Sequence, residues 1–355
     1  MTRLALLLPA LLLGACLAPR WDAEPDAHSD GRQFRNPGAP FDVGFTDLLR
    51  FYATREPGEW RRNMAIAPGP PPPQRVGEGE LRLTFINHAT VLVQADGVNL
   101  LTDPIWSERA SPVSWAGPKR YRPPGIAFED LPPIDVVMIS HNHYDHLDLP
   151  TLQRLQAAFD PLFVVPAGDD VVLRHYGITR VMALDWWHSA KLPGGCALTA
   201  VPVKHWSGRR LLPSGRNLSL WAGYVIGTRG GPVYFAGDTG YGDHFVATRE
   251  RFGPMRAALL PIGAYEPRWL TAYQHMAPVE AVQAHKDLLA RFSLGIHYGV
   301  FEMSDDGMHE PAAALIAAAR AALPDPTRFP PAAEGQHYEI EPLKEPASCP
   351  SPVPS

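Results

Sequence analysis

Residues 140–148 read Ser140-His141-Asn142-His143-Tyr144-Asp145-His146-Leu147-Asp148, directly after the apolar run Val136-Val137-Met138-Ile139. The run predicts a buried strand, because β-branched and apolar residues follow one another without polar alternation. The histidines therefore lie on a loop at the end of that strand, before a helix that begins near Leu149-Pro150. Imidazole nitrogens and carboxylate oxygens bind zinc, and a cluster this dense has donors for two ions. The stretch predicts a metal site; the alternative is a polar loop that is rich in histidine by chance.

Three further residues of the ligand type follow predicted strands. His205 comes after Leu198–Val203, Asp238 after Val233–Ala236, and His297 after Leu294–Ile296. Each of them alone is more often a structural histidine or a turn aspartate. Because all three share the strand-end position of the 141–146 cluster, together they predict the rest of a ligand set for two ions.

The remainder of the chain alternates predicted strands and helices. Strands are predicted at 81–85, 89–93, 98–102, 136–139, 162–166, near 181, and at 198–203, 218–226, 233–236 and 294–296; helices are predicted from 149, at 169–176, 278–289 and 311–323. This order predicts a mixed sheet structure covered by helices, in one catalytic domain of roughly residues 75–325. Residues 16–74 predict a linker and N-terminal extension, with a helix within Phe45–Trp60, and residues 326–355 predict a loosely ordered Pro-rich tail.

The composition is that of a globular protein. With 45% hydrophobic and 19% charged residues, a chain of 355 residues can bury a large core. The net charge is -5 and no lysine- or arginine-rich run is present, so the sequence indicates against a nucleic-acid partner. The sequence does not predict an oligomeric state.

The N-terminus predicts an export signal. The basic start Met1-Thr2-Arg3 precedes the apolar run Leu4–Leu13, which is too short to span a bilayer as a helix. Leu13-Gly14-Ala15-Cys16 resembles a bacterial lipoprotein cleavage box, which implies that residues 1–15 are a signal peptide and that Cys16 carries lipid. Leu17 is not acidic, which favours anchoring in the outer membrane, facing the periplasm. The alternative is an ordinary secretory signal in which Cys16 is incidental.

The other two cysteines are Cys196 and Cys349. An oxidising compartment would permit a disulfide between them, but the sequence does not require one. Neither cysteine has the spacing of a zinc-thiolate site, so we interpret both as structural or incidental.

The ligand-type residues together resemble a known family. The pattern His141-x-His143-x-Asp145-His146, followed by His205, Asp238 and His297, resembles the metallo-β-lactamase superfamily, an α+β fold built as a four-layered αββα sandwich. Further segments are similar to its N-acylphosphatidylethanolamine-hydrolysing phospholipase D branch: Asn87–Val93, Leu101–Ser107, Gly117–Pro124 and Leu131–Asp135. The resemblance spans roughly residues 80–305.

The resemblance implies a role for each candidate residue. His141, His143 and His205 would bind one zinc ion, Asp145, His146 and His297 a second, and Asp238 would bridge the two; other divalent metals are alternatives. Asp145 would also orient the attacking hydroxide. His275 would protonate the leaving oxygen or stabilise charge, against a purely structural role. Asp103 would orient a ligand histidine, and His88 would line the site or serve the fold.

The branch implies hydrolysis of a phosphodiester bond in a phospholipid. The substrate would be an N-acylphosphatidylethanolamine, and the products phosphatidic acid and the N-acylethanolamine. Fold alone does not fix the substrate, so a lactonase or a hydrolase of soluble esters or phosphodiesters remains an alternative, and β-lactam hydrolysis has less support. A second alternative is a non-catalytic module tethered in the cell envelope.

Overall fold

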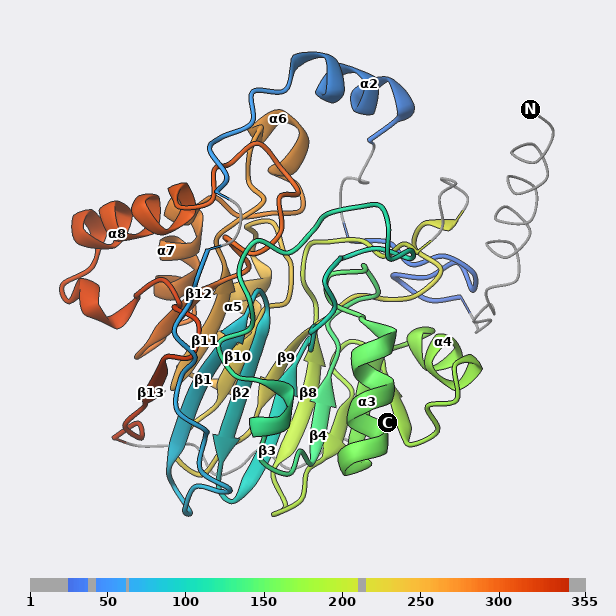
Figure 1. Cartoon of the computed structure of the whole chain (residues 1–355). Coiled ribbons are helices and arrows are strands. Elements are labelled where there is room, and N and C mark those ends of the chain that lie inside the picture. The colour runs from blue at the N-terminus through green and yellow to red at the C-terminus, as the bar shows by residue number, and fades with distance from the viewer. Residues whose placement is uncertain (1–24, 38–42, 62–63, 210–214, 345–355) are drawn as a thin grey trace.

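The structure is a computed structural model that describes residues 25–37, 43–61, 64–209 and 215–344 (Figure 1). The predicted signal peptide 1–15, Cys16 and Cys349 lie outside the described residues. Cys196 is disulfide-bonded. Among the described residues, no helix has both the length and the apolar character needed to cross a bilayer.

The first sheet has seven strands in the order β13-β1-β2-β3-β4-β5-β6. Their bounds are β1 Leu81–Asn87, β2 Thr90–Ala95, β3 Val98–Thr102, β4 Val136–Met138, β5 Leu162–Pro166, β6 Val181–Leu184 and β13 His337–Glu339. Strands β1, β2 and β3 are antiparallel, and the Asp96-Gly97 turn places Ala95 opposite Val98. Strands β3 to β6 are parallel, so β3, β4, β5 and β6 end at one edge of the sheet.

The second sheet has six strands in the order β12-β11-β10-β9-β8-β7. Their bounds are β7 Ser189–Lys191, β8 Ala197–Val201, β9 Gly223–Ile226, β10 Val233–Phe235, β11 Ala257–Pro261 and β12 Ser293–Ile296. Strands β10, β11 and β12 are parallel to one another, and β9 lies antiparallel between β8 and β10. Strands β8, β10 and β12 therefore end at the same edge of this sheet.

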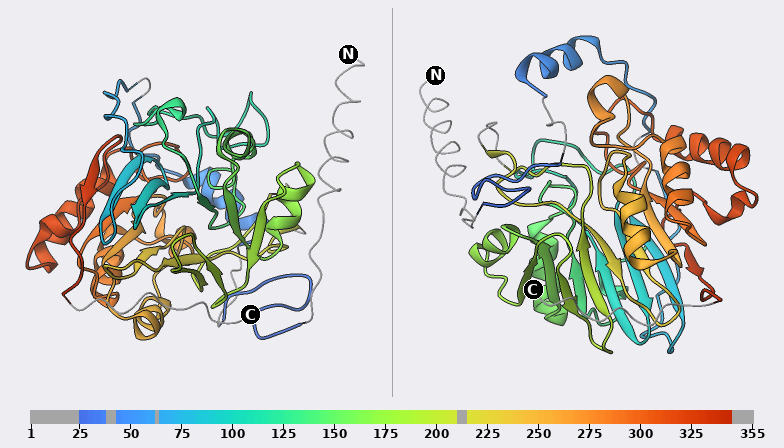
Figure 2. Two further views of the ribbon diagram at one scale, coloured as in Figure 1. Left: turned by 90° about the horizontal axis from the view of Figure 1, so that it is seen from below. Right: turned by 180° about the vertical axis from the view of Figure 1, so that it is seen from behind.

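Helices cover the outer face of each sheet, which gives four layers (Figures 1 and 2). The first sheet is covered by α3 Leu149–Phe159 and α4 Asp169–His175, and the second by α5 His244–Phe252, α7 Pro278–Asp287 and α8 Glu310–Ala322. Between the sheets, a buried cluster joins side chains such as Phe85 and Met138 to Leu198 and Phe235. The predicted αββα sandwich is confirmed.

Two short helices lie at the end of the sandwich where β4 and β8 finish. Helix α2, Phe45–Thr54, confirms the helix predicted within Phe45–Trp60, and α6 spans Arg268–Thr271. The guanidinium of Arg50 lies 4.2 Å from the ring of Trp269, which places the two helices side by side (Figure 1). The described residues also include 3-10 turns at Phe128–Asp130 and Pro326–Arg328.

The segments before and after residues 75–325 pack against the domain, whereas the sequence predicts a linker and a loose tail. Residues 25–36 are not a free linker, because Phe34 is 2% exposed and packs in the core between the sheets. Residues 326–344 are not a loose tail, because β13 pairs with β1 and Phe329 is 1% exposed. Apolar side chains on both flanks thus cover core that residues 75–325 alone would leave open to water.

Candidate metal centre

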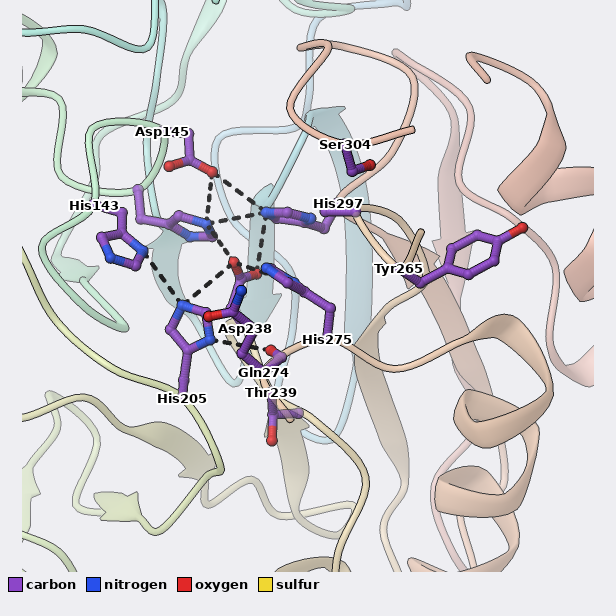
Figure 3. A network of polar contacts seen from close by, with 12 residues as sticks. His143, Asp145, His205, Asp238, Thr239, Tyr265, Gln274, His275, His297 and Ser304 are labelled. Atoms are coloured by element: carbon purple, nitrogen blue, oxygen red, sulfur yellow. Dashed lines mark hydrogen bonds and ion pairs between the residues drawn. The ribbon is translucent and has the colours of Figure 1, made fainter. Parts of the chain in front are cut away.

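The loops that follow four strands bring the predicted residues together. Residues 141–146 follow β4, and His205, Asp238 and His297 follow β8, β10 and β12. Because these strands finish at the same end of the sandwich, their loops meet at one point (Figure 3).

His141, His143 and His205 form the first group of converging donors. Nε2 of His141 lies 2.8 Å from Nδ1 of His143, and Nε2 of His205 lies 3.3 Å from the same Nδ1. One nitrogen of each ring lies within 4.8 Å of the other two, which is the spacing of atoms that share one ion.

Asp145, His146 and His297 form the second group. Nε2 of His146 lies 3.0 Å from Oδ2 of Asp145 and 3.2 Å from Nε2 of His297. Nε2 of His297 lies 3.4 Å from the same carboxylate oxygen.

Asp238 lies between the two groups. Its Oδ2 is 3.2 Å from Nε2 of His146 and 3.9 Å from Nε2 of His205, and its Oδ1 is 3.1 Å from Nε2 of His297. The carboxylate therefore faces ligands of both groups, as a bridge would. All seven predicted ligands are brought together, although their binding of metal stays a prediction.

Asp103 holds the outer nitrogens of two ligand histidines. Its Oδ2 accepts from Nδ1 of His146 at 2.6 Å and from the hydroxyl of Ser140 at 2.6 Å. That hydroxyl lies 2.9 Å from Nδ1 of His141 and accepts a hydrogen bond from this nitrogen. With Nδ1 protonated, the Nε2 lone pair of each ring points into the site, so Asp103 stands where the sequence predicts a residue that orients a ligand.

Comparison with known proteins places the chain in a family. Residues 98–298, more than half of the 355, match the sequence family described as "Beta-lactamase superfamily domain". The chain belongs to the beta-lactamase superfamily. Within this superfamily it is similar to proteins named for the N-acylphosphatidylethanolamine-hydrolysing phospholipase D branch, and the family and these relatives together support a metal-dependent hydrolase.

Two relatives carry the name of that branch. The chain is 42% identical over 236 residues to N-acyl-phosphatidylethanolamine-hydrolyzing phospholipase D 1 of Caenorhabditis elegans, covering 64% of this chain and 66% of that protein. It is 38% identical over 234 residues to the mitochondrial N-acyl-phosphatidylethanolamine-hydrolyzing phospholipase D of Saccharomyces cerevisiae, covering 64% of this chain. The match spans 49% of the yeast protein.

The fold of this chain is similar to that of a solved structure. Igni18, a metallo hydrolase of Ignicoccus hospitalis, has a TM-score of 0.55 at 23% sequence identity. The similarity covers 74% of this chain and 99% of Igni18. This likeness supports the fold.

The charge distribution of the hydrolase fits a divalent cation. Burial and the neighbouring histidines hold the pKa of His141 well below its usual range, so its ring is neutral and its lone pair is available. Although burial opposes it, Asp238 raises the pKa of His297 to about 9. Nitrogen lone pairs that face one another at 2.8 Å repel unless a proton or a cation lies between them, and the carboxylates nearby attract positive charge. A divalent ion between these donors would remove the repulsion and meet the attraction, so the cluster fits a divalent metal site.

His88 and His275 each contact a carboxylate of the ligand set. Nε2 of His88 donates to Oδ2 of Asp145 at 3.0 Å, and the His88 ring is 1% exposed. Nδ1 of His275 lies 3.9 Å from Oδ2 of Asp238, and its ring lies 5.3 Å from that of His205. The structure thus brings both predicted residues to the site, His88 through its hydrogen bond to Asp145 and His275 beside Asp238, as Figure 3 shows for His275.

Residues that brace the 141–147 loop were not predicted from the sequence. Asn142 donates to Oδ1 of Asp169 and accepts from the backbone N–H of Gly208, each at 2.8 Å. The guanidinium of Arg209 donates to the carbonyls of Asn142 and Leu147 at 2.9 Å and 2.8 Å. Asn142 lies within the quoted motif, but the other partners carry no local sequence signal.

Proposed function

We propose that the chain hydrolyses the phosphodiester bond of an N-acylphosphatidylethanolamine-like phospholipid, giving phosphatidic acid and the N-acylethanolamine. The observation that carries the proposal is the complete set of seven converging donors in a chain 42% identical over 236 residues to a protein named for this reaction. The non-catalytic alternative does not explain why every donor of such a set is present.

The proposed cofactor is a pair of divalent ions, most simply zinc. His141, His143 and His205 would hold one ion and Asp145, His146 and His297 the other, with Asp238 shared. Imidazole and carboxylate donors without thiolates suit zinc. When bound, such a pair lowers the pKa of a coordinated water towards about 7 and stabilises negative charge on phosphoryl oxygens.

In the proposed reaction a bond forms between a water oxygen and phosphorus, and the bond from phosphorus to the ethanolamine oxygen breaks. Asp145 is buried, and His146 and the hydrogen bond from His88 hold its pKa well below its usual range although burial opposes this. It therefore stays ionised and accepts a hydrogen bond from the attacking water, which aligns the oxygen with phosphorus.

His275 is suited to stabilise the leaving oxygen by donating a hydrogen bond. Burial lowers the pKa of this ring to about 4, so the imidazole is neutral at pH 7. A neutral imidazole donates a hydrogen bond but carries no extra proton to give away. Of the two roles expected from the sequence, this favours charge stabilisation over protonation. The attacking water would release its proton to solvent, and the leaving ethanolamine oxygen would take a proton from solvent.

The test is turnover by the zinc-loaded protein. N-acylphosphatidylethanolamine, phosphatidylethanolamine, a lactone and a β-lactam are supplied separately, and the products are measured by mass spectrometry. We expect phosphatidic acid from the first substrate and a loss of at least about 100-fold in Asp145→Asn. Absence of phosphatidic acid from either phospholipid, or faster turnover of the lactone or the β-lactam, would reject the proposal.

We also propose that lipid on Cys16 anchors the protein to the bacterial envelope, at the outer membrane and facing the periplasm. The lipoprotein-like box before Cys16 supports this, and a membrane anchor would place the enzyme beside a phospholipid substrate. Fractionation of cells that express wild-type protein or Cys16→Ala tests it. The wild type is expected in the outer-membrane fraction and the variant in the soluble fraction; a variant that stays with membranes would contradict the anchor.

A further inference from the structure

Residues 25–37, which we call the N-terminal strap, pack against the hydrolase domain. The backbone N–H of Phe34 donates to the carbonyl of Asn217 at 2.8 Å, and its ring is buried between the sheets. His28 lies 2.8 Å from the carboxylate of Asp185 and stacks on the ring of Trp186. Contacts at these two points fix the path of the strap, so that Asn36 reaches the edge of the metal centre.

The carboxamide of Asn36 joins three separate segments. Its Nδ2 donates to the carbonyl of His205 at 2.7 Å and to the hydroxyl of Tyr273 at 3.0 Å. Its Oδ1 accepts from Nε1 of Trp221 at 3.0 Å. An indole N–H only donates and a carbonyl only accepts, so the amide has one satisfactory orientation.

The segment that carries His205 and the segment that carries Tyr273 are joined a second time, next to the ring of His205. Nδ1 of His205 donates to the carbonyl of Gln274 at 3.1 Å, and Nε1 of Trp206 donates to the side chain of Gln274. With Asn36 on the other side, the hydrogen bonds close a ring through His205, Gln274 and Tyr273. This ring fixes both the backbone and the outer nitrogen of His205, and hence the direction of its Nε2.

We propose that Asn36 is a positioning residue of the metal centre, holding the His205 segment against the segment that carries His275. The strap is then a component of the catalytic unit. Asn36 precedes residues 98–298, so the family match does not account for it. The proposal is independent of the substrate, because it concerns metal retention by His205 and applies to any reaction at this centre.

The test compares Asn36→Ala with the control Gln33→Ala in the full chain. Gln33 is an exposed carboxamide on the same strap that donates instead to the carbonyl of Arg216. Zinc per chain is measured by atomic absorption while a chelator removes the metal. We expect Asn36→Ala to bind the more weakly held zinc ion about 10- to 100-fold less tightly, the usual effect of losing a partner of a ligand histidine. Gln33→Ala should behave as wild type.

Thermal melting of the metal-free proteins separates positioning from a general loss of stability. A positioning role predicts that Asn36→Ala loses metal affinity at 25 °C, where its metal-free form is still folded. Zinc retention equal to that of wild type in folded Asn36→Ala would overturn the proposal. So would equal loss of zinc in Gln33→Ala, which would show that the strap acts only through general stability.

Tyr273→Phe provides the second variant, in case Asn36→Ala does not fold. It removes one hydroxyl from the ring and leaves the contact between Asn36 and His205 in place. We expect zinc affinity to fall about fivefold, the effect of one neutral hydrogen bond. If both single variants fold, the double variant should lose less than the product of the two effects, because the residues share one network. Full additivity, or no effect of Tyr273→Phe, would contradict the proposal.

Discussion

Three residues at the metal centre have strained backbone conformations. His88, Asp103 and His297 have φ angles of +48°, +32° and +61°, a region that residues other than glycine rarely adopt. Each follows directly on a strand, and the backbone N–H of His297 donates to the carbonyl of His88 at 2.8 Å. The surrounding sheets hold these conformations, which cost about 1–3 kcal/mol each. Strain of this kind is typical of sites where geometry serves function.

Gly237 lets the loops of the two sheets approach each other. It has a φ of +59°, and a Cβ placed on it would lie 2.4 Å from Cβ of Ser140. Gly237→Ala should therefore push Asp238 and Ser140 apart and destabilise the fold by about 1–3 kcal/mol. Zinc analysis should show a loss of metal. Gly177→Ala, whose Cβ would meet nothing within 4 Å although its φ is also positive, should keep its metal. Full zinc content in Gly237→Ala would contradict this view of the loop contact.

At this scale the sequence predicts the donors and one residue that orients them, Asp103, but not the other residues that hold them. His141, His205 and His297 are recognisable because each follows an apolar run, and strand ends converge in folds of this class. The partners Ser140, Gln274 and Asn36 could not be identified. Asn36 is 169 residues from His205 in the chain, and no local pattern reports a contact of that range.

Strands with strong β formers were predicted well, and strands without them were missed. β3 and β5 have the predicted bounds because their valines, leucines and phenylalanine favour a buried strand. β11 was missed, since Ala257–Pro261 is rich in alanine and leucine, which favour helices in isolation. It forms a strand because both faces are buried, between the core cluster and α7. Tertiary burial, which the local sequence does not report, decided the outcome.

The strap should loosen as the pH rises. The hydrogen bond that His28 donates to the carboxylate of Asp185 raises the pKa of His28 above 6.5. The stability that this pair contributes is therefore complete below pH 6.5 and is lost as the pH passes the raised pKa. Burial raises the pKa of Asp185, but the hydrogen bond and the charge of His28 lower it, and the net pKa is below the usual value. The stability that the ionised Asp185 contributes is therefore lost only in acid. We expect about 1 kcal/mol of strap stability to disappear between pH 6 and pH 9.

Hydrogen exchange of the strap amides, corrected for intrinsic rates, measures this change. The Phe34 amide should be less protected at pH 9 than at pH 6, whereas His28→Gln should show little difference between the two. The amide of Val93, in the central strand β2, provides the reference. Equal protection of the Phe34 amide at both pH values would contradict the view that the His28–Asp185 pair holds the strap against the domain.

The whole domain extends to the last described residues. Phe329 packs with α7 and α8, and its ring stacks on His285 with the centroids 5.5 Å apart. Phe329→Ala should therefore cost about 3–5 kcal/mol in the free energy of unfolding, and Phe329→Leu clearly less. Chemical denaturation measures both. Stability unchanged in Phe329→Ala would mean that residues 326–344 lie outside the cooperative unit.

The proposed pair of ions binds where the strand ends of the two sheets meet. The most direct measurement is a crystal structure of the zinc-loaded protein with anomalous diffraction at the zinc edge, together with metal analysis. The account predicts about two ions per chain, one among His141, His143 and His205 and the other among Asp145, His146 and His297, with Asp238 touching both. A single ion at full zinc loading, or ions bound away from these residues, would contradict it.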